Sequence, residues 1–131
     1  MARSVEPHFW VRDLDASKEW YEALGFEERQ RNPQADPTWF QLGLGDVVLM
    51  ITSVPNDIAP NQGYLEEVAS RVGNGGAVSL YLHVDDADAM FERASTAGVE
   101  PIEDIWNPWW GGRQFTIQDP VGTWWTVYQS D

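Results

Sequence analysis

The sequence contains no cysteine among its 131 residues. A disulfide framework, a thiolate metal site and a cysteine nucleophile all require cysteine, so the sequence excludes these three kinds of chemistry. It also contains no apolar run near the roughly 18 residues that a membrane-spanning helix needs. Its first residues lack the apolar core of a signal peptide. We therefore expect a cytoplasmic protein without a membrane partner.

Basic residues are scarce. Lys and Arg together number 8 against 21 Asp and Glu, which gives a formal net charge of −13. Nucleic-acid binding needs clustered Lys and Arg to neutralise phosphates, so we expect no nucleic-acid partner. The acidic excess fits either a well-solvated surface or the attraction of a cationic ligand, and charge alone does not separate the two.

Tryptophan, by contrast, is abundant. The eight copies are Trp10, Trp20, Trp39, Trp106, Trp109, Trp110, Trp124 and Trp125. Because Trp combines a large apolar area with one polar N–H, it suits both a core and a platform for a ligand. Eight is more than a core of this size usually demands, so we expect some of these side chains at a binding surface.

The chain contains an internal repeat. The segment 11–16, which leads to Gly25, returns as the segment 84–89, which leads to Gly98, with a constant offset and no gap. Each copy places an Asp (Asp13 or Asp86) at the expected start of a helix and a Gly after its expected end. This spacing indicates a duplicated unit.

Hydrophobic periodicity predicts the same elements in both copies. In the first copy it predicts strands at 5–11, 26–31, 39–42 and 47–52, with a helix after Asp13. In the second it predicts strands at 78–84, 113–117 and 124–129, with a helix after Asp86. The connection 53–77 contains a candidate helix with Tyr64, Leu65, Val68 and Val72 on one face. The predicted fold class is α+β, with two βαβββ repeats (about 3–53 and 77–131) and a linker (about 54–76) in a single domain, residues 1–131.

Two stretches of the sequence resemble the vicinal oxygen chelate superfamily, which contains glyoxalases, bleomycin-resistance proteins and dioxygenases. The segment VRDLDAS, followed by WYEALGF ending at residue 26, resembles the opening of that family. The segments WGGRQF from residue 110 and DPVG from residue 119 resemble its close. The resemblance implies curled mixed sheets around a cavity, commonly within a homodimer. It does not imply one activity, because fold does not fix function.

Many enzymes of this family hold a divalent metal between the first and last strands of each unit. The resemblance places the ligand positions at Glu6, Ser79, Thr126 and near Leu49. Neutral hydroxyls offer a metal ion no charge, so we expect no metal and no other cofactor. A shifted site of Glu6, His8 and His83 is the alternative, with the histidines otherwise simply lining or flanking the cavity.

Strand alternation predicts which side chains face the cavity. Val5, Phe9 and Val11 fit the helix-covered face, while Trp125 and Val127 lie behind the last strand. The predicted ligand-binding residues are Glu6, His8, Trp10, Trp39, Tyr81, His83, Trp106, Trp109, Trp110, Trp124 and Tyr128. These aromatic side chains suit a flat or cationic ligand. The alternative is that they pack against one another as core.

The segment 105–112 carries three tryptophans beside Pro and Gly, outside any predicted strand or helix. Exposed aromatics on a loop imply a partner. They could form a lid over a ligand, a contact with a second subunit, or local packing. We expect Arg113 to pair with an acidic residue and brace this loop.

The sequence lacks the GxSxG, P-loop, GxGxxG and HExxH patterns, and we assign no catalytic residue. We predict a protein that sequesters a small aromatic or cationic compound, such as an antibiotic, as a homodimer. One alternative is a divalent-metal-dependent lyase, isomerase or dioxygenase with a degenerate site. Another is a structural or regulatory dimer with a filled cavity.

Overall fold

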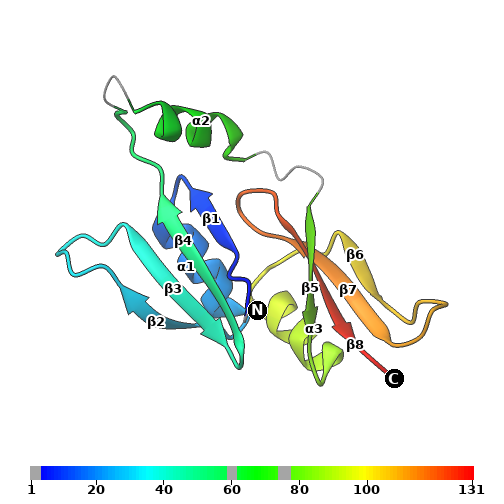
Figure 1. The fold of residues 1–131 in the computed structure, drawn as a ribbon. Coiled ribbons are helices and arrows are strands. Elements are labelled where there is room, and N and C mark those ends of the chain that lie inside the picture. The colour runs from blue at the N-terminus through cyan, green and yellow to red at the C-terminus, as the bar shows by residue number, and fades with distance from the viewer. Residues whose placement is uncertain (1–3, 59–61, 74–77) are drawn as a thin grey trace. The chain divides into compact units, whose positions relative to one another are not determined.

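The computed structural model describes residues 4–58, 62–73 and 78–131. The chain divides into two compact units, Met1–Gly73 and Asn74–Asp131 (Figure 1). The described elements of the first unit are β1 (His8–Val11), α1 (Leu14–Ala23), β2 (Glu27–Arg31), β3 (Trp39–Leu44), β4 (Val47–Ser53) and α2 (Gly63–Arg71). Those of the second are β5 (Ser79–His83), α3 (Ala87–Thr96), β6 (Glu103–Trp106), β7 (Arg113–Gln118) and β8 (Trp124–Gln129).

Both units have the same topology. The strand orders are β1-β4-β3-β2 and β5-β8-β7-β6. In each sheet the first strand pairs in parallel with the last, and the remaining pairs are antiparallel. The predicted α+β class with two βαβββ repeats is therefore confirmed.

The two repeated helices begin in the same way. Asp13 accepts a hydrogen bond from the Ala16 amide at 3.0 Å, and Asp86 accepts one from the Ala89 amide at 3.0 Å. Each bond satisfies an amide that the first helical turn leaves without a partner.

In the first unit, α1 covers one face of the sheet. Tyr21 of the helix and Leu24 at its C-cap are buried, as are Leu42 of β3 and Leu49 and Ile51 of β4. The Phe9 ring stacks on Tyr21 with centroids 6.4 Å apart. The alternate side chains of these strands therefore point to the opposite face.

The second unit repeats this arrangement with α3. Phe115 and Ile117 of β7 and Trp125 and Val127 of β8 are buried. Phe91 of α3 meets Phe115 edge to face, with centroids 5.2 Å apart.

The structure corrects two sequence-based expectations. Val5 is 91% exposed and does not join the helix-covered face, because β1 begins only at His8. Ile105 and Trp106 were expected outside any strand, but both belong to β6. The register shifts between Glu103 and Trp106, so a bulge interrupts the regular alternation there.

The helix expected in the connection is α2, which groups with the first unit. Arg12 holds it by donating a hydrogen bond from Nη2 to the Ala69 carbonyl at 2.9 Å. No helix among the described residues is long and apolar enough to cross a membrane.

Candidate functional site: two open sheet faces and a tryptophan loop

The face of the first sheet opposite α1, here called the first open face, carries aromatic and polar side chains. Trp39, Thr52 and Trp10 lie side by side on β3, β4 and β1. His8 lies opposite Met50 in the next row. Predicted site residues Trp10 and Trp39 therefore flank a single threonine.

Direct contacts connect these side chains. His8 Nε2 and Thr52 Oγ1 share a hydrogen bond of 2.7 Å, and the His8 ring lies 5.1 Å from the Trp10 ring. The Trp10 ring also meets Tyr64 of α2 edge to face at 6.2 Å. Glu6 accepts a hydrogen bond from Gln41 Nε2 at 3.0 Å. One carboxylate, one imidazole and three aromatic residues thus line this face.

Partial burial of His8 lowers the pKa of its imidazole below the ordinary 6.5, while the nearby Glu6 carboxylate partly opposes the shift. Folding therefore favours the neutral form of His8. The imidazole of His8 is protonated at a higher pH in the unfolded chain than in the folded chain. The contribution of neutral His8 to the free energy of unfolding is therefore complete above about pH 6.5. That contribution is lost as the pH falls through the window below 6.5.

The His8 titration tests this balance. We expect an NMR midpoint for His8 below 6.5. In the variant Glu6→Gln we expect a still lower midpoint, because the charge that raises the pKa is gone. A midpoint above 6.5, or an upward shift in Glu6→Gln, would show that burial does not dominate.

The face of the second sheet opposite α3, the second open face, presents a row across all four strands. Trp106 of β6, Gln114 of β7, Tyr128 of β8 and His83 of β5 are successive cross-strand neighbours. The bulge in β6 brings Trp106 into this row. Tyr81, His83 and Tyr128 form a triangle with ring centroids 5.7–6.5 Å apart.

The neighbouring row is polar and mostly buried. Glu103 Oε1 accepts hydrogen bonds from Gln114 Nε2 at 2.9 Å and from Thr116 Oγ1 at 3.4 Å. The hydroxyls of Thr116 and Thr126 lie 2.9 Å apart and share a hydrogen bond. Trp124 donates from Nε1 to Gln118 Oε1 at 2.8 Å, and its ring is partly exposed.

Residues 107–112, the tryptophan loop, form an aromatic cluster with Trp106 at the end of β6. Trp110 contacts Trp106 and Trp109 edge to face, with centroids 5.7 and 5.3 Å apart. Trp109 is 88% exposed, and the other two are more than a third exposed. Local packing therefore accounts for only part of their surface.

Several hydrogen bonds hold the loop in place. Arg113, as expected, pairs with an acidic residue: its Nε lies 2.9 Å from Asp88 Oδ2, and its Nη1 donates to Asn107 Oδ1 at 2.6 Å. The hydrogen bonds that Arg113 donates to the Asp88 carboxylate raise the pKa of Arg113 above its ordinary value. Tyr128 Oη donates to the Gly111 carbonyl at 3.2 Å. The loop is thus attached both to α3 and to the second open face.

The residues at the family's expected ligand positions are poor donors for a divalent metal, because Ser79 and Thr126 offer only neutral hydroxyls. Among residues 4–58, 62–73 and 78–131, no three His, Cys, Asp or Glu side chains gather closely enough to hold an ion. The hydroxyl of Thr126 is engaged in a hydrogen bond with the hydroxyl of Thr116. The position in the first unit that corresponds to Thr126 is Met50, opposite His8, and not Leu49, which is buried on the helix side.

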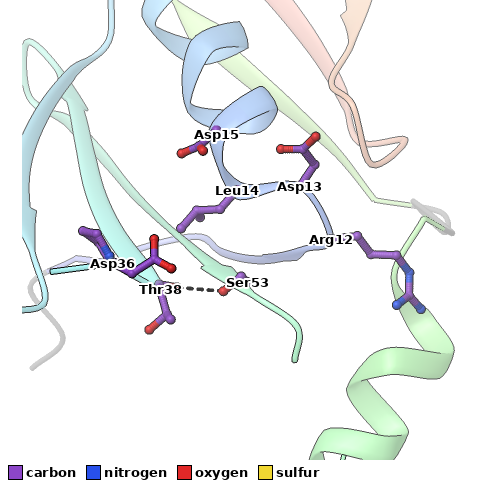
Figure 2. Close-up of a pocket in the computed structure, with 8 residues that line it drawn as sticks. Arg12, Asp13, Leu14, Asp15, Asp36, Thr38 and Ser53 are labelled. Atoms are coloured by element: carbon purple, nitrogen blue, oxygen red, sulfur yellow. Dashed lines mark hydrogen bonds between the residues drawn. The ribbon is translucent and has the colours of Figure 1, made fainter. Parts of the chain in front are cut away.

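A separate hollow of about 370 Å³ lies at the start of α1 (Figure 2). Its lining comprises Arg12, Asp13, Leu14, Asp15, Asp36, Pro37, Thr38 and Ser53. In Figure 2 the Arg12 side chain points away from the carboxylates and toward α2, where it bonds to Ala69. The hollow is acidic and contains none of the predicted site residues.

The eleven predicted residues thus fall into three groups. The first open face brings together Glu6, His8, Trp10 and Trp39. The second brings together Tyr81, His83, Tyr128, Trp124 and Trp106, and the loop adds Trp109 and Trp110. The structure describes each unit by itself, so the predicted shared cavity stays a prediction.

Sequence reasoning missed four polar residues, Thr52, Gln41, Gln114 and Glu103. Alternation within residues 113–117 was a usable signal, because Phe115 and Ile117 are apolar and Gln114 and Thr116 are not. The bulge that turns both Glu103 and Trp106 to the second open face left no signal in the sequence.

Comparisons with known proteins agree on the fold. The model of the Glyoxalase/Bleomycin resistance protein/Dioxygenase superfamily matches residues 5–127. An uncharacterised protein of Mycobacterium bovis, Mb0911c, is 28% identical over 96% of this chain and 82% of its own length.

Solved structures with the same fold include binders and an enzyme. A bleomycin-binding protein complexed with bleomycin has a TM-score of 0.69 at 23% identity and covers 99% of this chain and 100% of its own. TnmS3, an antibiotic-binding protein from Streptomyces sp. CB03234, has 0.65 at 26%, with 100% and 99% covered. A lactoylglutathione lyase from Agrobacterium tumefaciens has 0.66 at 20%, with 98% and 94% covered.

Proposed function

Because the chain belongs to the Glyoxalase/Bleomycin resistance protein/Dioxygenase superfamily, we propose that it binds a flat, cationic or aromatic small molecule and holds it without transforming it. The aromatic groups of the open faces and of the tryptophan loop supply the stacking surface. The observation that carries the proposal is the exposed cluster of Trp106, Trp109 and Trp110 on a chain of net charge −13.

Two physical arguments support this class of ligand. Aromatic faces attract cations through their quadrupole, with about 0.5–2 kcal/mol per well-placed pair. The acidic excess adds a long-range attraction for the same cations, which salt weakens. Two proteins of similar fold bind antibiotics: the bleomycin-binding protein and TnmS3.

The rival function is that of a metal-dependent lyase, isomerase or dioxygenase. It requires a metal-binding set, and the neutral hydroxyls of Ser79 and Thr126 at the expected ligand positions speak against one. Elemental analysis of the purified protein separates the two functions. A stoichiometric divalent metal that is lost in Glu6→Gln would favour the enzyme over the binder.

Isothermal titration calorimetry tests binding directly, with 9-aminoacridine, N-methylacridinium, ethidium and bleomycin as probes. We expect saturable binding that weakens as salt is added. The variant Trp110→Ala removes the ring that joins the cluster, so we expect about a tenfold weaker affinity for 9-aminoacridine, or about 1.4 kcal/mol.

Trp20→Phe is the control, because Trp20 lies on α1 and contacts Tyr21 there, and α1 covers the face of the first sheet opposite the first open face. It should leave the affinity unchanged. Absence of saturable binding across the four probes would contradict the proposal. If Trp110→Ala and the unaltered protein bind 9-aminoacridine with equal affinity, the tryptophan loop is not part of the binding site.

We also propose that the chain is a homodimer, as its family resemblance implies. Sedimentation velocity decides between a monomer and a dimer. A dimer that dissociates in Trp109→Ala would assign the exposed Trp109 ring to a second copy of the chain.

A further inference from the structure

The side-chain oxygen of Gln114, on the second open face, is a hydrogen-bond acceptor without a partner among the described residues. Its side chain is 3% exposed, and its Nε2 donates to Glu103 Oε1 at 2.9 Å. An ionised carboxylate only accepts hydrogen bonds, so the amide must turn its N–H toward Glu103 and its oxygen away. That oxygen, Gln114 Oε1, is buried and has no hydrogen-bond partner among the described residues.

The hydroxyl groups nearest along the sheet are already engaged. Tyr128, the neighbour of Gln114 on β8, donates its hydroxyl proton to the Gly111 carbonyl. Thr116 and Thr126 share a hydrogen bond with each other. Buried acceptors in folded proteins nearly always have a partner, so an unpaired one marks a place for an incoming donor.

The surroundings of Gln114 specify what kind of donor fits. Its cross-strand neighbours on the second open face are Trp106 and Tyr128, and each supplies an aromatic ring. The Glu103 carboxylate, bonded to the same amide, adds negative charge. A flat cation that bears an N–H would stack on the rings and donate its hydrogen to Oε1.

We propose that Gln114, oriented by Glu103, is the specificity-determining residue of this face and selects aromatic cations that carry an N–H donor. This inference rests on the proposed function and narrows it to amino- or amidino-substituted ligands. Trp106 is the neighbour with room to move, because it lies on the edge strand β6 and is 37% exposed. Its ring turns outward when the ligand reaches the amide.

Two dyes of the same shape and charge test the selection. At neutral pH, 9-aminoacridine is a planar cation with N–H donors, whereas N-methylacridinium is a planar cation without them. By calorimetry we expect the unaltered protein to prefer 9-aminoacridine by about tenfold or more, because a polar site rejects an analogue that lacks its hydrogen bond. In Gln114→Met, which keeps the length of the side chain but removes the acceptor, we expect equal affinities.

Glu103→Gln is the second variant and does not depend on the tolerance of the fold for methionine. A glutamine at 103 can donate to Gln114 Oε1 and satisfy it internally. We therefore expect this variant to fold and to lose the preference for 9-aminoacridine, while the loss of the carboxylate charge weakens the binding of both dyes alike. If Gln114 had only a structural role, both variants would shift the urea midpoint of unfolding and would keep the preference for 9-aminoacridine.

Each outcome separates the two proposals. Saturable but equal binding of both dyes to the unaltered protein would overturn the selection by Gln114 and leave the binding function standing. A preference that persists in both variants would overturn it as well. No saturable binding of any of the four probes would overturn the binding function together with the selection.

Discussion

Replacing Phe115 by alanine is expected to lower the free energy of unfolding by about 3–5 kcal/mol. The Phe115 side chain is fully buried on the helix side of β7, and its ring meets Phe91 of α3 edge to face. Truncation to alanine removes the apolar area and leaves a cavity between sheet and helix that the neighbours fill only in part. Urea denaturation followed by circular dichroism measures the change.

Trp109→Ala is the matched control for this prediction, because it also truncates a large aromatic side chain in the same unit. Trp109 is 88% exposed, and among the described residues its ring contacts that of Trp110. We expect a cost below about 1 kcal/mol. Similar losses of unfolding free energy in both variants would contradict the burial of Phe115 or the exposure of Trp109.

The strands of the second unit therefore have two different faces, one for stability and one for polar and aromatic contacts. Phe115 and Ile117 point toward α3, whereas Gln114 and Thr116 between them point to the second open face. Sequence alternation predicts this division well wherever apolar and polar residues alternate strictly. It placed Trp124 and Tyr128 opposite the buried Trp125 and Val127.

The repeat explains why most of the fold was predictable. The constant offset places Asp13 and Asp86 at equivalent helix starts, and both form the same cap. Two copies of one pattern support each other wherever both show the same signal, as they do for the two capped helices. The family resemblance implied mixed sheets, and both sheets contain parallel and antiparallel pairs.

The contribution of β6 to the candidate site was not predictable, for a geometric reason. Glu103 and Trp106 are three residues apart, so a regular strand would send their side chains to opposite faces. The bulge between them brings both to the second open face. The bulge depends on pairing with β7, a contact between distant residues that period-two alternation does not contain.

The acidic hollow at the start of α1 escaped prediction for a related reason. Asp13 and Asp15 belong to the helix start, but Asp36 comes from the connection between β2 and β3. Only the folded chain brings them to one place. Asp13 is also committed to the helix cap, so its carboxylate serves the fold there.

Replacing Gly112 by alanine is also expected to cause a large loss of stability, because Gly112 lies at the base of the tryptophan loop. Gly112 has a φ of +80°, and an added Cβ would lie 2.5 Å from the Gln129 carbonyl oxygen and 2.6 Å from Tyr128 Oη. The left-handed conformation costs a non-glycine residue about 1–2 kcal/mol. The overlap adds about 1–3 kcal/mol, because a paired strand carbonyl cannot move aside freely.

Gly98→Ala isolates the second term. Gly98 has the same φ of +80°, and nothing lies within 4 Å of its added Cβ. Both variants therefore carry the conformational cost, and only Gly112→Ala carries the overlap. We expect urea denaturation to show the larger loss of stability for Gly112→Ala, by the amount of the overlap.

The two glycine variants should also differ in binding. Relief of the overlap requires the loop to move away from Tyr128, which breaks the hydrogen bond from Tyr128 to the Gly111 carbonyl. A displaced loop no longer presents its tryptophans beside the second open face, so 9-aminoacridine should bind at least tenfold more weakly to Gly112→Ala than to Gly98→Ala. Equal stability and equal binding of the two variants would show that the loop is not anchored at Gly112, and the tryptophan cluster would then be a separate surface.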